Sequence, residues 1–289
     1  MVPAQVQEVL SALECPVCRS ANLDGSEERV TCRHCARVFI SINGYLNLYP
    51  GEPEPVTPIQ RLMQFPPAVA VYEGVWRPLG YFLASNHSFL KGLERITSLV
   101  QRRRGLILDL ACGPGNVTRQ IARLAPDAVV IGFDLSPQML ERAVRLTARE
   151  GLKNVFYIRG SALAMPFGAE SFEAVTCCGA LQLFTDQDQA VGEIARVLGR
   201  DGEFVCQTTV FPRRAPWIVR LGNRLLKFGC FSLDDFRGRL ERFNFDLTTE
   251  EQSSLTYIFR AAKARDGIRP RHETARPAQP WLRAAESAD

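Results

Sequence analysis

The fold is decided by the stretch LDLACGPGNVT, which occupies residues 108–118. The apolar run that leads into it is typical of a buried strand, and the chain then enters a turn containing Gly113 and Gly115. Glycines in such a turn let the backbone pass close beneath a ligand, and a helix is expected to begin near Asn116. A strand, a glycine turn and a helix in this order predict an α/β domain that binds a nucleotide-like cofactor.

Two residues near the turn distinguish the possible cofactors. A GxG turn is shared by domains for NAD, FAD and S-adenosylmethionine, so it does not choose among them. The dinucleotide fingerprint has a third glycine where this chain has Thr118, and Asp109 would oppose a pyrophosphate. The same carboxylate is compatible with a zwitterionic amino-acid tail and a cationic sulfonium. Charge therefore favours S-adenosylmethionine.

Asp134 is the candidate for holding a ribose. It ends the next apolar run, 19 residues after Gly115, where a carboxylate can accept hydrogen bonds from two ribose hydroxyls. The alternative is that Asp134 is an acidic residue at the start of the following helix, although Ser136 can also serve as that helix cap.

From Gly105 onward, short apolar runs alternate with amphipathic helical patterns. This alternation predicts a Rossmann-like α/β fold with a doubly wound, mostly parallel sheet of seven strands. The last two β-like pieces, NFDLTTEE and SLTYIFRAA, have a tight connection and predict an antiparallel hairpin at the sheet edge. The expected divisions are a zinc ribbon at 1–50, a linker and helical lid at 51–104, the cofactor domain at 105–262 and a disordered tail at 263–289.

Four successive motifs resemble those of the class I S-adenosylmethionine-dependent methyltransferases. They are LDLACGPGNVT, IGFDLSPQMLERA, RGSALAMPFGAESFEAV and EIARVLGRDGEF, within residues 104–210. The resemblance is closest to the branch that contains the ubiquinone and menaquinone C-methyltransferases and many natural-product methyltransferases. It implies a methyltransferase whose cofactor pocket lies along these motifs.

The resemblance also implies roles for individual residues. The methionine part of the cofactor would contact Asp109, Gly113 and Gly115, and the ribose would contact Asp134. The adenine would lie against Leu135 and Met139, with its edge near Ser161 and Ala162. Apart from the resemblance, Cys178 is a further candidate for the cofactor pocket, with packing in a buried strand as the alternative. The family usually has aspartate where this chain has Ser161 and Glu173; because serine accepts a hydrogen bond less strongly, a lower cofactor affinity is expected.

Two cysteine pairs near the N-terminus predict a metal site. Cys15 and Cys18 are separated by thirteen residues from Cys32 and Cys35, a spacing typical of two zinc knuckles. Four sulfur ligands leave no open position, so a structural Zn²⁺ is expected, with His34 exposed rather than bound.

The cysteine module resembles the N-terminal zinc ribbon of ribosomal RNA guanine-N1 methyltransferases, including the segment Gly44–Leu48. RNA methylation is therefore the main alternative function. The charge of residues 1–50 argues against it, because their four arginines face five acidic residues, and an RNA-binding surface should be basic. Ribbon-bearing methyltransferases of bacteria and plastids, which share a segment like Tyr72–Arg77, are the nearer resemblance.

The composition predicts a globular protein of the cytoplasm. The chain has 289 residues, is 46% hydrophobic and carries a net charge of +4. That charge is too small to indicate a nucleic-acid partner. No apolar run reaches the length of a membrane span, and the N-terminus lacks the early basic residues of a secretory signal.

A small-molecule acceptor is expected over the carboxyl ends of the strands. The candidate contacts are Tyr72, Trp76, Gln182 and Trp217. Residues 211–227 combine basic and apolar residues, which suits an anionic substrate, a carrier protein or a membrane surface, and equally a solvated helix that caps the sheet. The aromatic lid favours a lipid-like or polyketide-like acceptor.

Methyl transfer requires an in-line approach to the sulfonium methyl group, and a base only where the acceptor must lose a proton. Glu73 and His87 are the candidate bases, without a spacing signature. A third possible function is a cyclase or binding protein that keeps this fold without methylating.

Overall fold

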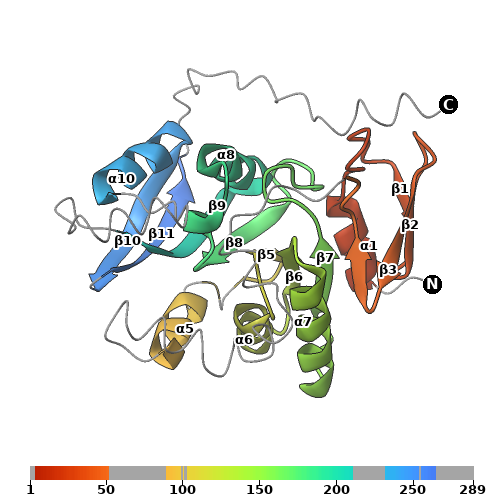
Figure 1. Cartoon of the computed structure of the whole chain (residues 1–289), viewed down its shortest axis with the longest axis horizontal. Helices are drawn as coiled ribbons and strands as arrows, with labels where there is room; N and C mark the ends of the chain where they lie inside the picture. The colour runs from red at the N-terminus through yellow and green to blue at the C-terminus, as the bar shows by residue number, and fades with distance from the viewer. Residues whose placement is uncertain are drawn as a thin grey trace.

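One continuous sheet of 11 strands crosses the molecule (Figure 1). The computed structural model describes residues 4–51, 89–98, 100, 103–210, 232–253 and 255–264. The strands are β1 (Leu23–Gly25), β2 (Arg29–Cys32), β3 (Val38–Ile42), β4 (Tyr45–Asn47), β5 (Leu106–Leu110), β6 (Val129–Asp134), β7 (Val155–Arg159), β8 (Phe172–Cys178), β9 (Leu198–Thr209), β10 (Phe245–Ser253) and β11 (Thr256–Lys263). The helices are α1 (Ala4–Ala12), α5 (Phe89–Ser98), α6 (Asn116–Leu124), α7 (Pro137–Arg149), α8 (Gln187–Val197), α10 (Leu233–Arg242) and the 3₁₀ helix η2 (Leu181–Leu183).

Seven of these strands form the predicted doubly wound sheet, in the order β7-β6-β5-β8-β9-β11-β10. The pairs from β7 to β9 are parallel, and β11 is antiparallel to both β9 and β10. The predicted edge hairpin is confirmed: β10 and β11 pair from Phe245↔Lys263 to Ser253↔Thr256. The expected Rossmann-like α/β fold is therefore present.

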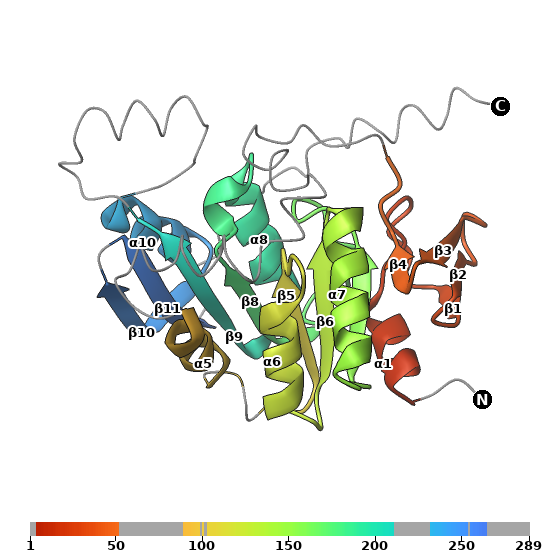
Figure 2. The same cartoon turned by 60° about the horizontal axis from the view of Figure 1, so that its bottom comes forward.

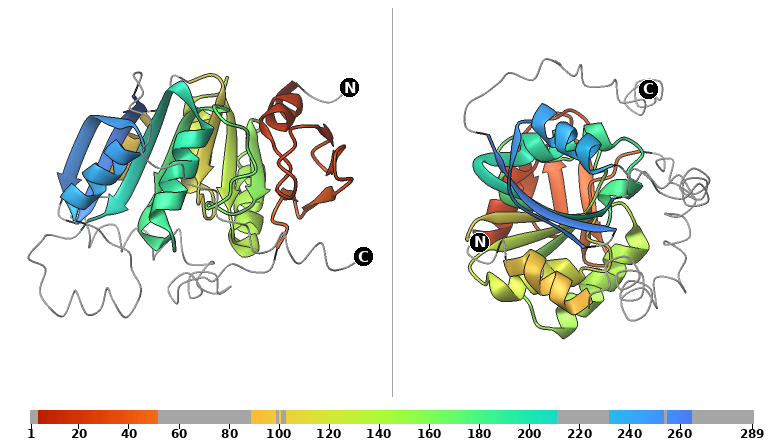
Figure 3. Two further views of the ribbon diagram at one scale, coloured as in Figure 1. Left: turned by 90° about the horizontal axis from the view of Figure 1, so that it is seen from above. Right: turned by 90° about the vertical axis from the view of Figure 1, so that its left-hand side faces the viewer.

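Helices cover both faces of this sheet (Figures 2 and 3). The side chains of α8 and α10 pack in one core with Leu108 and Ile131. On the opposite face, those of α5 and α6 pack with Ile107 and Val130. Because the central strands β5 and β6 are covered on both sides, their sequences are almost entirely apolar rather than alternating.

The N-terminal cysteine module extends the same sheet. Strands β1, β2, β3 and β4 are antiparallel neighbours, and β4 pairs in parallel with β7 through Leu46↔Ile158 and Asn47↔Arg159. Leu13 forms an isolated bridge with Phe167, and both residues lie in one core. The sequence indicated a small separate unit here and did not predict this shared sheet. The boundaries proposed at residues 50 and 105 stay predictions.

Several predicted features lie outside the described residues. These are most of the lid at 51–104, the basic stretch 211–227 and nearly all of the tail at 263–289. The part of the lid segment that is described, α5, packs through Leu93 and Ile96 into the core beside α6. Within the described ranges, no helix combines the length and apolarity needed to cross a bilayer.

Phe167 offers a test of the junction between the module and the sheet. Its ring lies 5.4 Å from that of Phe133 and 5.0 Å from that of Phe172, and it is fully buried. We expect Phe167→Ala to lower the free energy of unfolding by about 3–5 kcal/mol, measured by urea denaturation, because it leaves a cavity. The control Leu124→Ala, at a position 38% exposed, should change stability by about 0.5 kcal/mol or less. Equal losses in the two variants would contradict this role.

Candidate active site

The candidate site lies at the carboxyl ends of three neighbouring parallel strands. Strand β5 leads into the glycine turn, β6 ends in Asp134, and β8 ends beside Gly179. The strand order runs outward from β5 in both directions, so β5 and β8 flank a topological switch point. Open α/β sheets bind ligands in the crevice at such a point.

The two glycines of the turn are required for different reasons. Gly113 and Gly115 have φ angles of 55° and 80°, in the left-handed region that favours glycine. A Cβ at Gly115 would come within 2.4 Å of the hydroxyl oxygen of Tyr157, so this glycine permits close packing. A Cβ at Gly113 would meet no atom of the described residues within 4 Å. Gly113 therefore faces the open side of the turn.

The carboxylate of Asp134 fixes this turn from the neighbouring strand. One oxygen accepts a hydrogen bond from the backbone N–H of Gly113 and the other from that of Ser136, each at 2.8 Å. Burial raises the pKa of Asp134, while hydrogen bonds from Ser136, Gly113 and Leu135 act in the opposite direction. A carboxylate has about four lone-pair positions, so further hydrogen bonds can be accepted.

The alternative interpretation is that Asp134 caps the helix that follows it. Ser136 occupies the N-cap position of α7, and its hydroxyl oxygen accepts a hydrogen bond from the backbone N–H of Met139. The capping role thus belongs to Ser136. The carboxylate of Asp134 instead accepts a hydrogen bond from the backbone N–H of Ser136. Its predicted contact with a ribose stays a prediction.

Asp109 lies beneath the turn, in the core. Its side chain is 1% exposed, and its two carboxylate oxygens accept hydrogen bonds from the hydroxyls of Thr118 at 2.6 Å and Thr176 at 2.8 Å. From the sequence, Thr118 was recognised only as the position of a missing glycine, and Thr176 was not identified. The structure thus shows why a hydroxyl is useful at both positions. The predicted contact of Asp109 with the methionine part is not tested by this arrangement.

The predicted adenine residues lie at the ends of β6 and β7. Gly160, the residue after β7, donates its N–H to the backbone carbonyl of Asp134 at 3.1 Å, which brings the two strand ends together. Met139 is 6% exposed and Ser161 is 5% exposed, whereas Leu135 and Ala162 are half-buried. The hydroxyl oxygen of Ser161 accepts the N–H of Leu163 at 3.0 Å, so it already stabilises its own loop.

The end of β8 contains two further predicted residues. Cys178 is 7% exposed and precedes Gly179, whose φ angle is 77°. Gln182 is 4% exposed; its side chain donates to the carbonyl of Gly179 at 3.1 Å and accepts from the hydroxyl of Thr208 at 3.0 Å. Gln182 therefore holds the turn after β8. Its predicted contact with substrate stays a prediction.

The remaining predicted residues of the substrate side are not described. The two candidate bases and three of the candidate acceptor contacts lie outside the described residues, namely Glu73, His87, Tyr72, Trp76 and Trp217.

The four cysteines of the N-terminal module meet at one point. Their Sγ atoms all lie within 4.8 Å of one another, and the Cys15–Cys35 and Cys18–Cys32 distances are both 3.6 Å. A tetrahedral zinc site with bonds of about 2.3 Å places its sulfurs about 3.8 Å apart. The cluster therefore fits a zinc ion. Burial raises the pKa of Cys32, but backbone hydrogen bonds from Cys35 and His34 outweigh this effect and lower it to about 7.

Comparison with known proteins agrees with the fold and the glycine turn. Residues 107–202 match the family model of a methyltransferase domain. A demethylmenaquinone methyltransferase of Thermus thermophilus is 40% identical over 99 residues, which are 34% of this chain and 44% of that protein. An uncharacterized chloroplastic methyltransferase of Arabidopsis thaliana is 26% identical over 220 residues, which are 71% of this chain and 61% of that protein.

A solved structure shows the same fold. It is the geranyl diphosphate C-methyltransferase from Streptomyces coelicolor, in complex with Mg²⁺, geranyl-S-thiolodiphosphate and S-adenosyl-L-homocysteine. The alignment has a TM-score of 0.53 at 15% identity and covers 60% of this chain and 76% of that one.

The fold and the matched motifs define a class I methyltransferase domain. This chain carries such a domain, of the S-adenosylmethionine-dependent kind, which confirms the resemblance predicted from its motifs. The chain spans less than half the length of the Thermus relative and about three-fifths of the Arabidopsis one.

Gly115 and Gly113 provide a matched test of the turn. We expect Gly115→Ala to lower the free energy of unfolding by about 2–5 kcal/mol, because a left-handed alanine and a contact with Tyr157 both destabilise the fold. Gly113→Ala should lower the free energy of unfolding by only about 1–2 kcal/mol, the cost of a left-handed backbone at alanine. Urea denaturation of both variants measures the difference. If the two losses were equal, the close contact with Tyr157 would not be the reason for glycine at 115.

Proposed function

We propose that the chain transfers a methyl group from S-adenosylmethionine to a small apolar acceptor of lipid-like or polyketide-like class. The observation that carries this proposal is the arrangement of Gly113, Asp134 and Gly179 at adjoining strand ends. A Cβ at either glycine would meet no described atom within 4 Å, so the described residues leave space beside both turns. A carboxylate with unused acceptor positions lies at the end of the next strand.

The residues present fit the cofactor that the domain implies. The turn at Gly113 and Gly115 suits the amino-acid part, and we propose that the carboxylate of Asp134 accepts hydrogen bonds from the ribose hydroxyls. We expect Leu135 and Met139 to contact the flat adenine ring beyond the ribose. Asp109 lies below the turn, and we expect its negative charge to attract the positively charged methionine part of the cofactor.

The proposed step needs positioning more than covalent catalysis. When bound, S-adenosylmethionine supplies an electrophilic methyl group, and an acceptor in line with the carbon–sulfur bond displaces the neutral thioether. The chain contributes by orienting the two partners over the ends of β5 and β8. Glu73 and His87 remain the candidates for removing an acceptor proton.

The names of two similar proteins support an apolar acceptor. The Thermus relative is named for a demethylmenaquinone, and the Streptomyces structure for geranyl diphosphate. Both names denote molecules with an isoprenoid part. Residues 211–227 are proposed to contact an anionic group of the substrate, a carrier protein or a membrane surface. RNA methylation and a non-methylating role are the alternatives that the assay must separate.

The cofactor assignment is tested by calorimetry with S-adenosylhomocysteine. Asp134→Ala should weaken binding about 10- to 150-fold for each ribose hydrogen bond lost, because a bond to a charged group contributes about 1.5–3 kcal/mol. The control is Asp127→Ala, an exposed aspartate before the opposite end of β6, which should bind as the unmodified chain does. Equal binding by Asp134→Ala and the unmodified chain would remove the ribose assignment.

The acceptor class is tested in the same preparation with methyl-labelled S-adenosylmethionine. Label should pass into an organic-soluble metabolite when an extract is supplied. Label recovered in RNA would favour the alternative nucleic-acid substrate. Bound S-adenosylmethionine that never yields S-adenosylhomocysteine, with every extract and RNA tried, would favour a non-methylating role.

We further propose that the four cysteines hold one structural zinc ion. Metal analysis of the purified chain should give one zinc per chain, and Cys35→Ser should reduce this content because thiolates are the preferred ligands. His34→Ala is the matched control, since His34 is exposed and lies between two of the cysteines. Zinc loss in the His34 variant, or full zinc content after Cys35→Ser, would contradict the proposed ligand set.

A further inference from the structure

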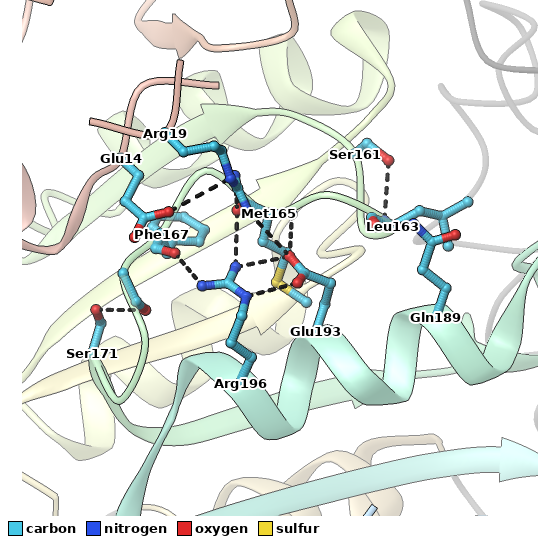
Figure 4. A network of polar contacts seen from close by, with 11 residues as sticks. Glu14, Arg19, Ser161, Leu163, Met165, Phe167, Ser171, Gln189, Glu193 and Arg196 are labelled. Carbon is cyan, nitrogen blue, oxygen red and sulfur yellow. Dashed lines mark hydrogen bonds and ion pairs between the residues drawn. The ribbon is translucent and has the colours of Figure 1, made fainter. Parts of the chain in front are cut away.

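The loop that follows β7 connects the candidate cofactor site with the cysteine module. It begins at Gly160, which donates its N–H to the carbonyl of Asp134, and it carries Ser161 and Ala162. It then passes between the module and helix α8 (Figure 4). Two backbone bonds join it to the module: Glu14 donates to the carbonyl of Pro166, and Gly168 donates to that of Ala12, each at 2.9 Å.

Met165 is the point at which this loop is held from both sides. Its N–H donates to the carboxylate of Glu193 on α8 at 2.7 Å. Its carbonyl accepts a hydrogen bond from Arg19 of the cysteine module at 2.9 Å and another from Arg196 on α8 at 3.1 Å. The side chain of Met165 is fully buried. The backbone of Met165 therefore depends on charged groups from both neighbours.

These charged groups form one partly buried cluster. The carboxylate of Glu193 pairs with Arg196 at 2.7 Å and lies 4.0 Å from Arg19, which also lies 3.6 Å from Glu14. Their side chains are only 14–20% exposed. Removing one member of such a cluster leaves its partners poorly compensated. The geometry around Met165 should thus respond strongly to the loss of Arg19.

Hydrogen bonds continue from Met165 back to the strand end. Gln189 on α8 donates to the carbonyl of Leu163 at 2.6 Å, and Leu163 donates to the hydroxyl of Ser161. Ala164 also donates to the backbone carbonyl of Ser161, at 3.3 Å. The five residues from Ser161 to Met165 are therefore held as a unit (Figure 4).

Arg19 in turn is placed by the first cysteine knuckle. It directly follows Cys18, and its N–H donates to the carbonyl of Cys15 at 2.9 Å. Its φ angle is 60°, a left-handed conformation that a non-glycine residue keeps only where its surroundings fix it. A metal that gathers Cys15 and Cys18 would supply that constraint.

A second contact links the end of the cysteine module to the same region. The guanidinium of Arg159, at the end of β7, lies 5.0 Å from the ring centroid of Tyr49. The same side chain donates to the carbonyl of Leu135 at 3.0 Å. Leu135 follows Asp134 directly. The module thus reaches the loop after β7 through Arg19, and the end of β7 through Tyr49.

We propose that zinc occupancy of the cysteine site and cofactor binding are energetically coupled, with Arg19 and Tyr49 as the positioning residues. The inference rests on the proposed cofactor site and adds a role for the ribbon: it forms the outer support of the pocket wall made by Leu135 and Ser161. Loss of zinc releases the knuckle, Arg19 leaves Met165, and the loop at 160–165 loses its fixed position.

The coupling is tested first with variants of the full chain. Arg19→Ala should keep its zinc but bind S-adenosylhomocysteine about 5- to 150-fold more weakly in calorimetry, the usual range for coupled sites. Tyr49→Leu should weaken binding in the same direction. Arg33→Ala is the matched control, because Arg33 lies in the second knuckle and pairs with Asp24 inside the module. Its affinity for S-adenosylhomocysteine should equal that of the unmodified chain.

A second measurement needs no variant. Coupling is reciprocal, so saturating S-adenosylhomocysteine should tighten zinc binding by the same factor. Competition for zinc with a colorimetric chelator, with and without S-adenosylhomocysteine, measures this factor in the unmodified chain. In Arg19→Ala the factor should shrink toward unity.

The two proposals fail in different ways. If the unmodified chain did not bind S-adenosylhomocysteine, the proposed function itself would fall. If the unmodified chain bound S-adenosylhomocysteine, and Arg19→Ala and Tyr49→Leu bound it equally well, the proposed coupling would be contradicted but not the proposed function. The same conclusion would follow if S-adenosylhomocysteine left the zinc affinity unchanged.

Discussion

The carboxylate of Asp134 is the constraint on which the site depends. A half-buried carboxylate is stabilised by hydrogen bonds to its oxygens, and here the donors are the backbone N–H groups of Gly113 and Ser136. One donor belongs to the turn after β5 and the other to the first residue of the helix cap on α7. A single side chain thereby fixes the direction in which two elements leave the sheet. The left-handed glycines and the cap residue are consequences of that geometry.

The sequence predicted the features that depend on local pattern. The glycine turn, the alternating strands and helices, and the hairpin from Phe245 to Lys263 all follow from neighbouring residues, and the structure confirms them. The pairing of Leu46 with Ile158 was not predictable, because the two residues lie far apart in the chain. The sequence around either residue does not indicate its partner. Thr176 was missed for the same reason: a buried threonine in a strand gives no sign that it serves Asp109.

The candidate site shows the same division. Asp134 could be placed from its spacing alone, since a strand end and a following helix fix its surroundings. Gln182 could not, because its commitment to Gly179 and Thr208 depends on how η2 folds over β9. Ser161 is intermediate: its position next to the strand end was predicted, whereas its hydrogen bond with Leu163 belongs to a loop whose shape is set from outside by Arg19 and Glu193.

The pairing of β4 with β7 has a consequence for the behaviour of the protein in solution. Without β4, strand β7 would present an unpaired row of N–H and C=O groups, which is a template for joining a strand of another molecule. With it, the outermost of the described strands are β1, which has three residues, and β10, which carries Glu250 and Glu251 near its middle. Short and charged edges resist such addition. By pairing with β7, the cysteine module covers an edge to which a strand of another molecule could otherwise add.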